Sequence, residues 1–218
     1  LISRPTQIFR VEVAVEPQNI LDWLAGQESE TLLFWSDREG RFQIGGVGVA
    51  DSISLSDLRT DELFGYLAAR LTPRHKSLRY LGGICFDPQN ADEDWKDFGC
   101  CQFWLPRFEL LKIGRETFFA CNVVMKAKED VRRLIQQIQE DLEALRGTFS
   151  GESPQLPRLK KRTDRPDLKS WLKSVQEVLV LLEKGPLEKL VLARKSDLRL
   201  DKALRPLAFL HEIQKATN

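Results

Sequence analysis

One lysine lies in a row of apolar residues that an extended chain would place on a single face. Residues 187–194 read LEKLVLAR, and in a strand Lys189 shares its face with Leu187, Val191 and Ala193. Burial disfavours a protonated amine and lowers its pKa. Lowering the pKa of a lysine from about 10.4 to about 7.4 takes roughly 4 kcal/mol, so Lys189 could act as a general base only in a closed, dry site. The structural alternative is an edge-strand lysine that snorkels to water.

The sequence carries none of the short motifs that mark the common nucleotide, hydrolase and zinc sites. It has no G-x-x-x-x-G-K-[ST] loop, no G-x-S-x-G and no H-E-x-x-H. Gly45, Gly46 and Gly48 lie inside an expected strand and do not open a helix, so we interpret them as close-packing or bulge glycines. The four cysteines lack metal-binding spacing, and we expect reduced, mostly buried thiols at Cys85, Cys100, Cys101 and Cys121.

Composition limits the classes of protein and of partner. The chain has 218 residues, of which 42% are hydrophobic and 30% charged, which suits one large or two small globular domains. A formal net charge of +1 gives no global reason to expect nucleic acid or an anionic membrane as partner. We see no secretory signal and no apolar run near the roughly 20 residues of a membrane span. We therefore expect a trimmed or mature chain in the cytoplasm.

Hydrophobic periodicity predicts an α+β fold with largely antiparallel sheets and packed helices. Residues 9–15 alternate as a strand with one buried, apolar face. The other expected strands are 31–35, 41–49, 78–86, 98–105, 108–113, 117–125 and 187–200. The expected helices are 20–24, 61–71, 131–145, 171–182 and one that begins at Pro206. Short polar connections between the strands of residues 78–125 favour an antiparallel meander over parallel crossovers.

The chain divides into three parts on this pattern. Residues 1–147 form a β-rich portion, residues 148–166 an exposed connector with several prolines, and residues 167–218 a last portion. The connector holds a basic cluster within residues 158–165. Because no aromatic residues interleave with these charges, we interpret the cluster as a solvated linker and not as an anion-binding site.

The LEKLVLAR segment and several upstream motifs resemble the chorismate-utilising enzymes, and most closely the isochorismate synthases. The upstream motifs are GGICFDP at residues 82–88, Trp95, Phe98, Gly99 and FWLPRFEL at residues 103–110. The resemblance implies conversion of chorismate to isochorismate with Mg²⁺, by addition of water at ring C2 and loss of the C4 hydroxyl. Lys189 matches the lysine that serves these enzymes as general base. Relatives that make anthranilate carry glutamine there, whereas salicylate synthases share the lysine.

The resemblance also implies parts that this sequence does not contain. Relatives continue with a general-acid glutamate and the glutamates that bind Mg²⁺, so we expect the metal ligands beyond Asn218 and none within the chain. We interpret the acidic residues that are present as a solvated loop and a helix start; they are Asp92, Glu93, Asp94, Glu129 and Asp130. Residues 167–218 then begin the chorismate-binding catalytic portion of one truncated fold.

These implications lead to a set of functional expectations. We expect a chain that is inactive alone, whose missing C-terminal half would complete a monomeric enzyme of menaquinone or siderophore biosynthesis. Two alternatives stay open: a noncatalytic binding or assembly module derived from the family, and a salicylate or anthranilate synthase relative.

Overall fold

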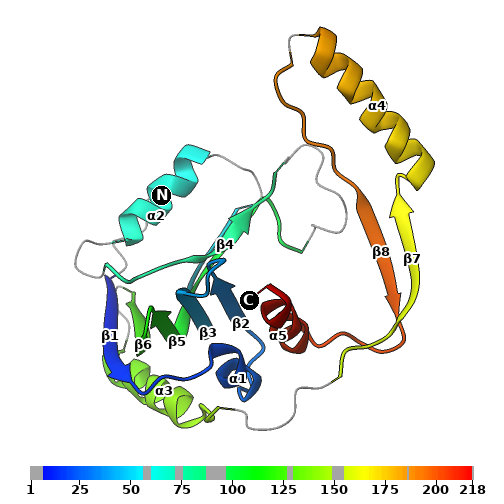
Figure 1. Cartoon of the computed structure of the whole chain (residues 1–218). Coiled ribbons are helices and arrows are strands. Elements are labelled where there is room, and N and C mark those ends of the chain that lie inside the picture. The colour runs from blue at the N-terminus through cyan, green and yellow to red at the C-terminus, as the bar shows by residue number, and fades with distance from the viewer. Residues whose placement is uncertain are drawn as a thin grey trace. The chain divides into compact units, whose positions relative to one another are not determined.

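The computed structural model describes residues 7–55, 60–71, 76–86, 97–126, 130–148, 155–185 and 187–217. The chain forms two compact units, one of Leu1–Gly151 with Gln214–Asn218 and one of Glu152–Ile213. The first unit contains β1 (Gln7–Val15), α1 (Ile20–Ala25), β2 (Leu32–Ser36), β3 (Phe42–Leu55), α2 (Thr60–Arg70), β4 (Leu81–Ile84), β5 (Cys101–Ile113), β6 (Glu116–Met125) and α3 (Val131–Glu143). The second contains β7 (Leu159–Arg165), α4 (Leu168–Lys184) and β8 (Lys195–Leu200), and α5 (Pro206–Thr217) crosses the division (Figure 1).

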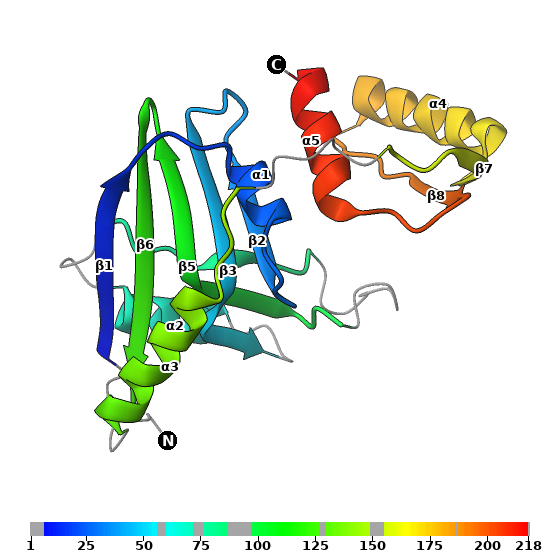
Figure 2. The same ribbon diagram turned by 90° about the horizontal axis from the view of Figure 1, so that it is seen from below.

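The first unit is built on one antiparallel sheet. Its strands lie in the order β1-β6-β5-β3-β2, and β4 pairs with the first residues of β5 beyond the end of β6 (Figure 2). Helices cover both faces: α1 packs on the face of Gly45, whereas Leu63 of α2 packs with Ile53 and Cys101 on the opposite face. The α+β class with antiparallel sheets, predicted from periodicity, is confirmed.

Two predicted strands, 98–105 and 108–113, are one continuous strand in the structure. Pro106 has no N–H to donate to the ladder, yet β5 runs through it from Cys101 to Ile113. The register of the neighbouring strand shifts there, since Val49 pairs with Pro106 and Asp51 with Leu105. The bulge thus accommodates the proline within the sheet. The strand predicted over residues 78–86 is shorter in the structure, where Leu81–Ile84 form β4.

The glycines of β3 have the packing role that we expected. A Cβ at Gly45 would lie 2.5 Å from Ile20 Cγ2, and a Cβ at Gly46 would lie 2.6 Å from Pro106 Cγ. Gly48 has a φ of +65° beside the bulge, a backbone conformation that L side chains rarely adopt. Close packing and the bulge therefore require these glycines, as predicted.

The strand at residues 9–15 forms, but its buried face is the polar one. Ile8 and Arg10 are buried, whereas Val11 and Val13 are 62% and 50% exposed. Arg10 is buried because its guanidinium donates to Glu109 Oε2 at 2.8 Å and to Asn122 Oδ1 at 2.9 Å. The prediction that the apolar row faces the core was wrong, since ion pairing across the sheet selects the other face.

The predicted helices at 61–71, 131–145, 171–182 and from Pro206 are confirmed as α2, α3, α4 and α5. Asp130 begins α3 as expected, because its side chain accepts hydrogen bonds from the N–H groups of Arg132 and Arg133. Asp92, Glu93, Asp94 and Glu129 lie outside the described residues.

None of the four cysteines is in a disulfide, and only Cys101 is fully buried. No helix of the described ranges is long and apolar enough to cross a membrane.

The expected connector at residues 148–166 is partly a strand. Residues 159–165 form β7, which pairs antiparallel with β8 and places the basic cluster in a two-stranded sheet. Arg162 and Arg165 are held by ion pairs with Asp164 and Asp197. Pairing with a strand that is at least thirty residues away overrides the local signal of the prolines.

Candidate functional site

The LEKLVLAR segment joins α4 to β8 in the second unit (Figure 1). We predicted a strand over residues 187–200, but only Lys195–Leu200 pair in a ladder, and residues 187–194 have no regular structure. The ladder between β7 and β8 ends at the pair Arg165 and Lys195, after which Pro166 leads into α4. Among the described residues no strand lies beside residues 187–194, so their backbone groups have no ladder partner there.

The C-terminal end of this segment is fixed by Arg194. Its Nε donates to the carbonyl of Pro166 at 3.0 Å, and its Nη2 lies 3.3 Å from Asp164 Oδ2. The same guanidinium lies over the ring of Trp171 at 5.9 Å from the centroid. Asp164 also accepts a hydrogen bond from Ser196 Oγ at 2.6 Å, and this bond makes the largest contribution to lowering the pKa of Asp164. One arginine thus ties the segment to β7 and to the first turn of α4.

Lys189 faces solvent together with the apolar residues of its row. Leu187 is 41% and Val191 79% exposed, and Lys189 and Ala193 are exposed as well. The opposite row is better covered towards its end, where Leu192 and Arg194 are half-buried. The two rows therefore differ in exposure only over residues 191–194, and the predicted strand is not formed there. The described residues thus form no closed, dry site around Lys189.

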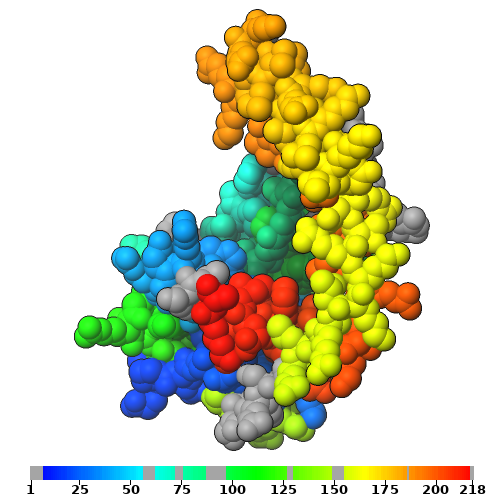
Figure 3. Space-filling view, turned by 45° about the vertical axis from the view of Figure 1, so that its right-hand side comes forward, coloured from blue at the N-terminus to red at the C-terminus, as the bar shows by residue number. Residues whose placement is uncertain are grey.

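The second unit has almost no core of its own. Among its described residues only Ala208 is buried, while Leu168, Leu172, Leu179 and Leu181 of α4 are each more than half exposed. In Figure 3 the side chains of α4, coloured yellow to orange, stand at the surface along the helix. Exposed apolar surface on this scale is typical of a face that packs against another element. Lys189 and these leucines of α4 thus all lie on exposed surface of the second unit.

A buried polar cluster in the first unit was not predicted as such. Besides its contacts with Arg10, Glu109 Oε1 accepts from the amide of Asn122 at 2.5 Å, and that amide also donates to the carbonyl of Pro106. Glu109 and Asn122 are fully buried. Burial raises the pKa of Glu109, and the neighbouring Arg10 opposes that shift. Glu109 lies in the FWLPRFEL motif, but its partners Arg10 and Asn122 come from other strands, so no local pattern indicates that the three meet.

The described part of the chain offers no set of ligands for a metal ion. Within it no three His, Cys, Asp or Glu side chains gather closely enough to hold one. The carboxylates of Asp51, Asp164 and Glu109 are each engaged by an arginine. These residues therefore do not fit a magnesium centre.

Three comparisons with known proteins agree with one another. A sequence profile of the family described as "Chorismate binding enzyme" matches residues 2–218. Isochorismate synthase 2, chloroplastic, of Arabidopsis thaliana is 25% identical over 95% of this chain and 42% of its own length. Isochorismate synthase MenF of Escherichia coli strain K12 is 24% identical over 87% of this chain and 40% of its own length.

The fold is similar to a solved structure. The structure of MenF, the menaquinone-specific isochorismate synthase from Escherichia coli, superposes with a TM-score of 0.72 at 20% identity, over 96% of this chain and 45% of that one. The chain thus spans less than half the length of the curated relatives it matches.

Proposed function

The chain belongs to the family of chorismate-binding enzymes, and from this premise we propose that it is the N-terminal portion of an isochorismate synthase. Two relatives in the comparisons are isochorismate synthases. The observation that carries the proposal within this chain is the row of Leu187, Lys189, Val191 and Ala193, an apolar surface with one amine in its middle. Its proposed substrate is chorismate.

Lys189 has the role of general base in this proposal. Its neutral amine takes a proton from water as the water oxygen forms a bond to C2 of chorismate. Both ring double bonds shift, from C1=C2 to C1=C6 and from C5=C6 to C4=C5, as the bond from C4 to its hydroxyl oxygen breaks. A general acid supplies the proton with which that hydroxyl leaves as water. One water enters and one leaves, so the product is the isomer isochorismate. We assign that acid and the ligands of the Mg²⁺ implied by the resemblance to the length of the relatives that this chain does not span.

The amine can perform this step only when it is covered. A general base is most effective when its pKa lies near the working pH, and for a lysine this requires burial in apolar surroundings. The described residues leave Lys189 exposed. We therefore infer that the 218-residue chain alone does not form isochorismate.

The first experiment measures isochorismate formation by this chain with chorismate and Mg²⁺, beside a longer protein that extends to the full length of the relatives. We expect turnover by the longer protein only, and its loss when Mg²⁺ is removed by chelation. Turnover by the chain alone would contradict the inference of inactivity.

The second experiment tests Lys189 in the longer protein. Lys189→Ala should lower kcat by about a hundredfold or more, the usual contribution of a general base, and should remove the acidic limb of the pH profile. Lys173→Ala is the matched control, because Lys173 is an exposed lysine of α4 that pairs with Glu177 at 3.7 Å. Full activity of Lys189→Ala would refute the assigned role.

The alternatives make different predictions. A noncatalytic assembly module should be monodisperse and melt cooperatively as 218 residues, whereas the exposed leucines of α4 favour dye binding and self-association. An aminating relative would form product in proportion to added ammonia. A salicylate synthase would release pyruvate and salicylate in place of isochorismate.

A further inference from the structure

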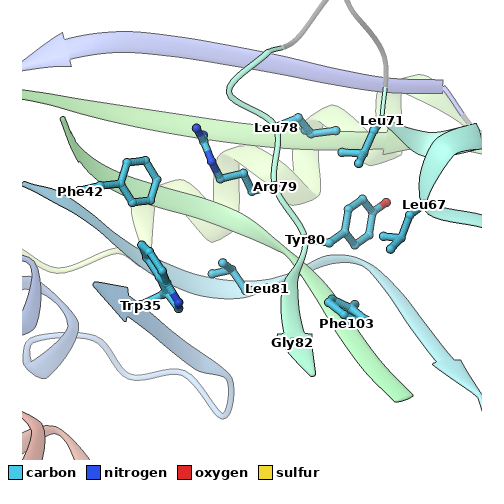
Figure 4. Close-up of a pocket in the computed structure, with 10 residues that line it drawn as sticks. All are labelled: Trp35, Phe42, Leu67, Leu71, Leu78, Arg79, Tyr80, Leu81, Gly82 and Phe103. Carbon is cyan, nitrogen blue, oxygen red and sulfur yellow. The ribbon is translucent and has the colours of Figure 1, made fainter. Parts of the chain in front are cut away.

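The first unit contains a cavity that the proposed reaction does not use. Its volume is about 590 Å³, within the range of roughly 300 to 1,000 Å³ that is typical of ligand sites. It lies on the sheet face that α2 covers, and most of its lining is apolar, with Leu67, Leu78 and Phe103 among the lining residues. Figure 4 shows two polar side chains among them, those of Arg79 and Tyr80.

One wall of the cavity combines a cation with two aromatic rings. Trp35 of β2 and Phe42 of β3 meet edge to face, with ring centroids 5.5 Å apart. The guanidinium carbon of Arg79 lies 4.7 Å from the centroid of the Phe42 ring. Figure 4 shows Trp35, Phe42 and Arg79 on the same side of the cavity. A stacked guanidinium is weakly hydrated and keeps its in-plane N–H donors, which suits it to bind a carboxylate.

The guanidinium of Arg79 is not neutralised by a carboxylate of the described residues, in contrast to those of Arg10 and Arg70. Arg10 and Arg70 are paired with the carboxylates of Glu109 and Asp51. Among the described residues Arg79 forms no ion pair, and its hydrogen bond is from Nη1 to the carbonyl of Ser77 at 2.7 Å.

The nearby acidic groups are already engaged. Asp51 Oδ2 accepts from Tyr80 at 2.6 Å and from Arg70 at 2.8 Å. Arg79 is close enough to act on the pKa of Glu109, but that carboxylate is held by Arg10 and by an amide of the sheet. Among the described lining residues, the cavity therefore presents one positive charge on a largely apolar surface and no carboxylate.

We propose that this cavity binds a small aromatic carboxylate, with its ring against Trp35 and Phe42 and its carboxylate accepting hydrogen bonds from Arg79. The ligand should lack an ammonium group, because the described lining has no free carboxylate to pair with one. The site is independent of the proposed isomerase activity, since it contains no residue of the LEKLVLAR segment.

Calorimetric titration of the 218-residue chain with three matched compounds tests the proposal. Hydrocinnamate, hydrocinnamyl alcohol and phenylalanine share a phenyl ring and differ in carrying a carboxylate, a neutral hydroxyl or both a carboxylate and an ammonium. We expect hydrocinnamate to bind at least about tenfold more tightly than the other two, as one charge-assisted contact allows.

Variants locate the binding. Arg79→Met keeps the aliphatic stem over Phe42 and should remove the preference for the acid, with about a tenfold weaker Kd for hydrocinnamate. Arg115→Met, in the exposed turn between β5 and β6, is the matched control and should bind as the unaltered chain does. Phe42→Leu should weaken all three compounds, and near-ultraviolet circular dichroism checks that each variant is folded.

Three results would overturn the proposal. They are equal binding of the acid and the alcohol, an unchanged Kd in Arg79→Met, and the absence of saturable binding at millimolar concentrations of hydrocinnamate. None of these results bears on isochorismate formation, so failure here and failure of the proposed enzyme are separate outcomes.

Discussion

Replacing Arg10 by methionine removes the cation from the buried cluster while keeping a side chain of similar length. The side chain of Arg10 is 2% exposed, and Nη1 contacts both Glu109 and Asn122 within 2.9 Å. Nε also donates to Glu12, whose side chain is 30% exposed. Without the guanidinium, Glu109 keeps only the amide of Asn122 as a side-chain partner.

The loss should be about 3 to 5 kcal/mol of the free energy of unfolding near neutral pH, the usual cost of removing one partner from a buried ion pair. The contact with Glu12 adds no more than about 1 kcal/mol, because that carboxylate is partly solvated. Domains of this kind have about 5 to 15 kcal/mol in total. Arg10→Met should therefore remain folded but with a small margin.

The deficit should depend on pH. Burial raises the pKa of Glu109 in the folded chain, and Arg10 opposes that shift, so its removal raises the pKa further. A carboxyl whose pKa is higher in the folded state holds its proton more tightly there. Its contribution to stability is complete below the unfolded pKa, about 4.3, and is lost as pH rises through the folded pKa. Arg10→Met should thus lose more stability at about pH 8 than at about pH 5.

Urea unfolding at the two pH values measures this difference, with Arg115→Met as the control for loss of one exposed arginine. The double variant Arg10→Met/Glu109→Leu should recover at least half of the loss at the higher pH, because no buried charge is then left without its partner. Equal deficits at both pH values, or strictly additive effects in the double variant, would refute the account of the cluster.

Three further outcomes follow from the geometry. Gly45→Val should cost about 1 to 3 kcal/mol in thermal unfolding, because a Cβ there would lie 2.5 Å from a side-chain atom of α1, whereas Gly147→Ala meets nothing within 4 Å and should be neutral. Tyr80→Phe should cost about 1 kcal/mol through loss of its hydrogen bond to Asp51, and urea unfolding that matches the unaltered chain would contradict this. Arg194→Met should speed amide hydrogen exchange in residues 187–193, and unchanged exchange would show that Arg194 does not fix the segment.

Features that depend on neighbouring residues could be predicted from the sequence. The helices α3 and α4 were predicted because an apolar stripe of helical period is a local signal, and Asp130 also marked the start of α3. The close packing at Gly45 was found for the same reason, since a glycine inside a strand pattern indicates a close approach.

Features that depend on residues far apart in the chain could not be predicted from the sequence. The buried face of β1 was predicted wrongly because Arg10 is separated from Glu109 by 99 residues and from Asn122 by 112. The same applies to the cavity, whose cation and rings come from Arg79, Trp35 and Phe42 on separate elements. An arginine that stacks on a ring from another strand leaves no spacing that sequence reasoning could detect.

One additional element packed on residues 187–194 would bury both Lys189 and its apolar neighbours. An element that pairs with residues 187–194 would bury Leu187 and Val191, which are now 41% and 79% exposed. Full burial of such a side chain stabilises by about 1.5 to 3 kcal/mol, so covering the exposed parts of both would contribute about 2 to 4 kcal/mol. Lowering the pKa of a lysine by three units costs roughly 4 kcal/mol, a comparable amount. Covering the apolar row would thus supply most of the free energy needed to keep a neutral amine beside it, as the general base that we propose for Lys189 requires.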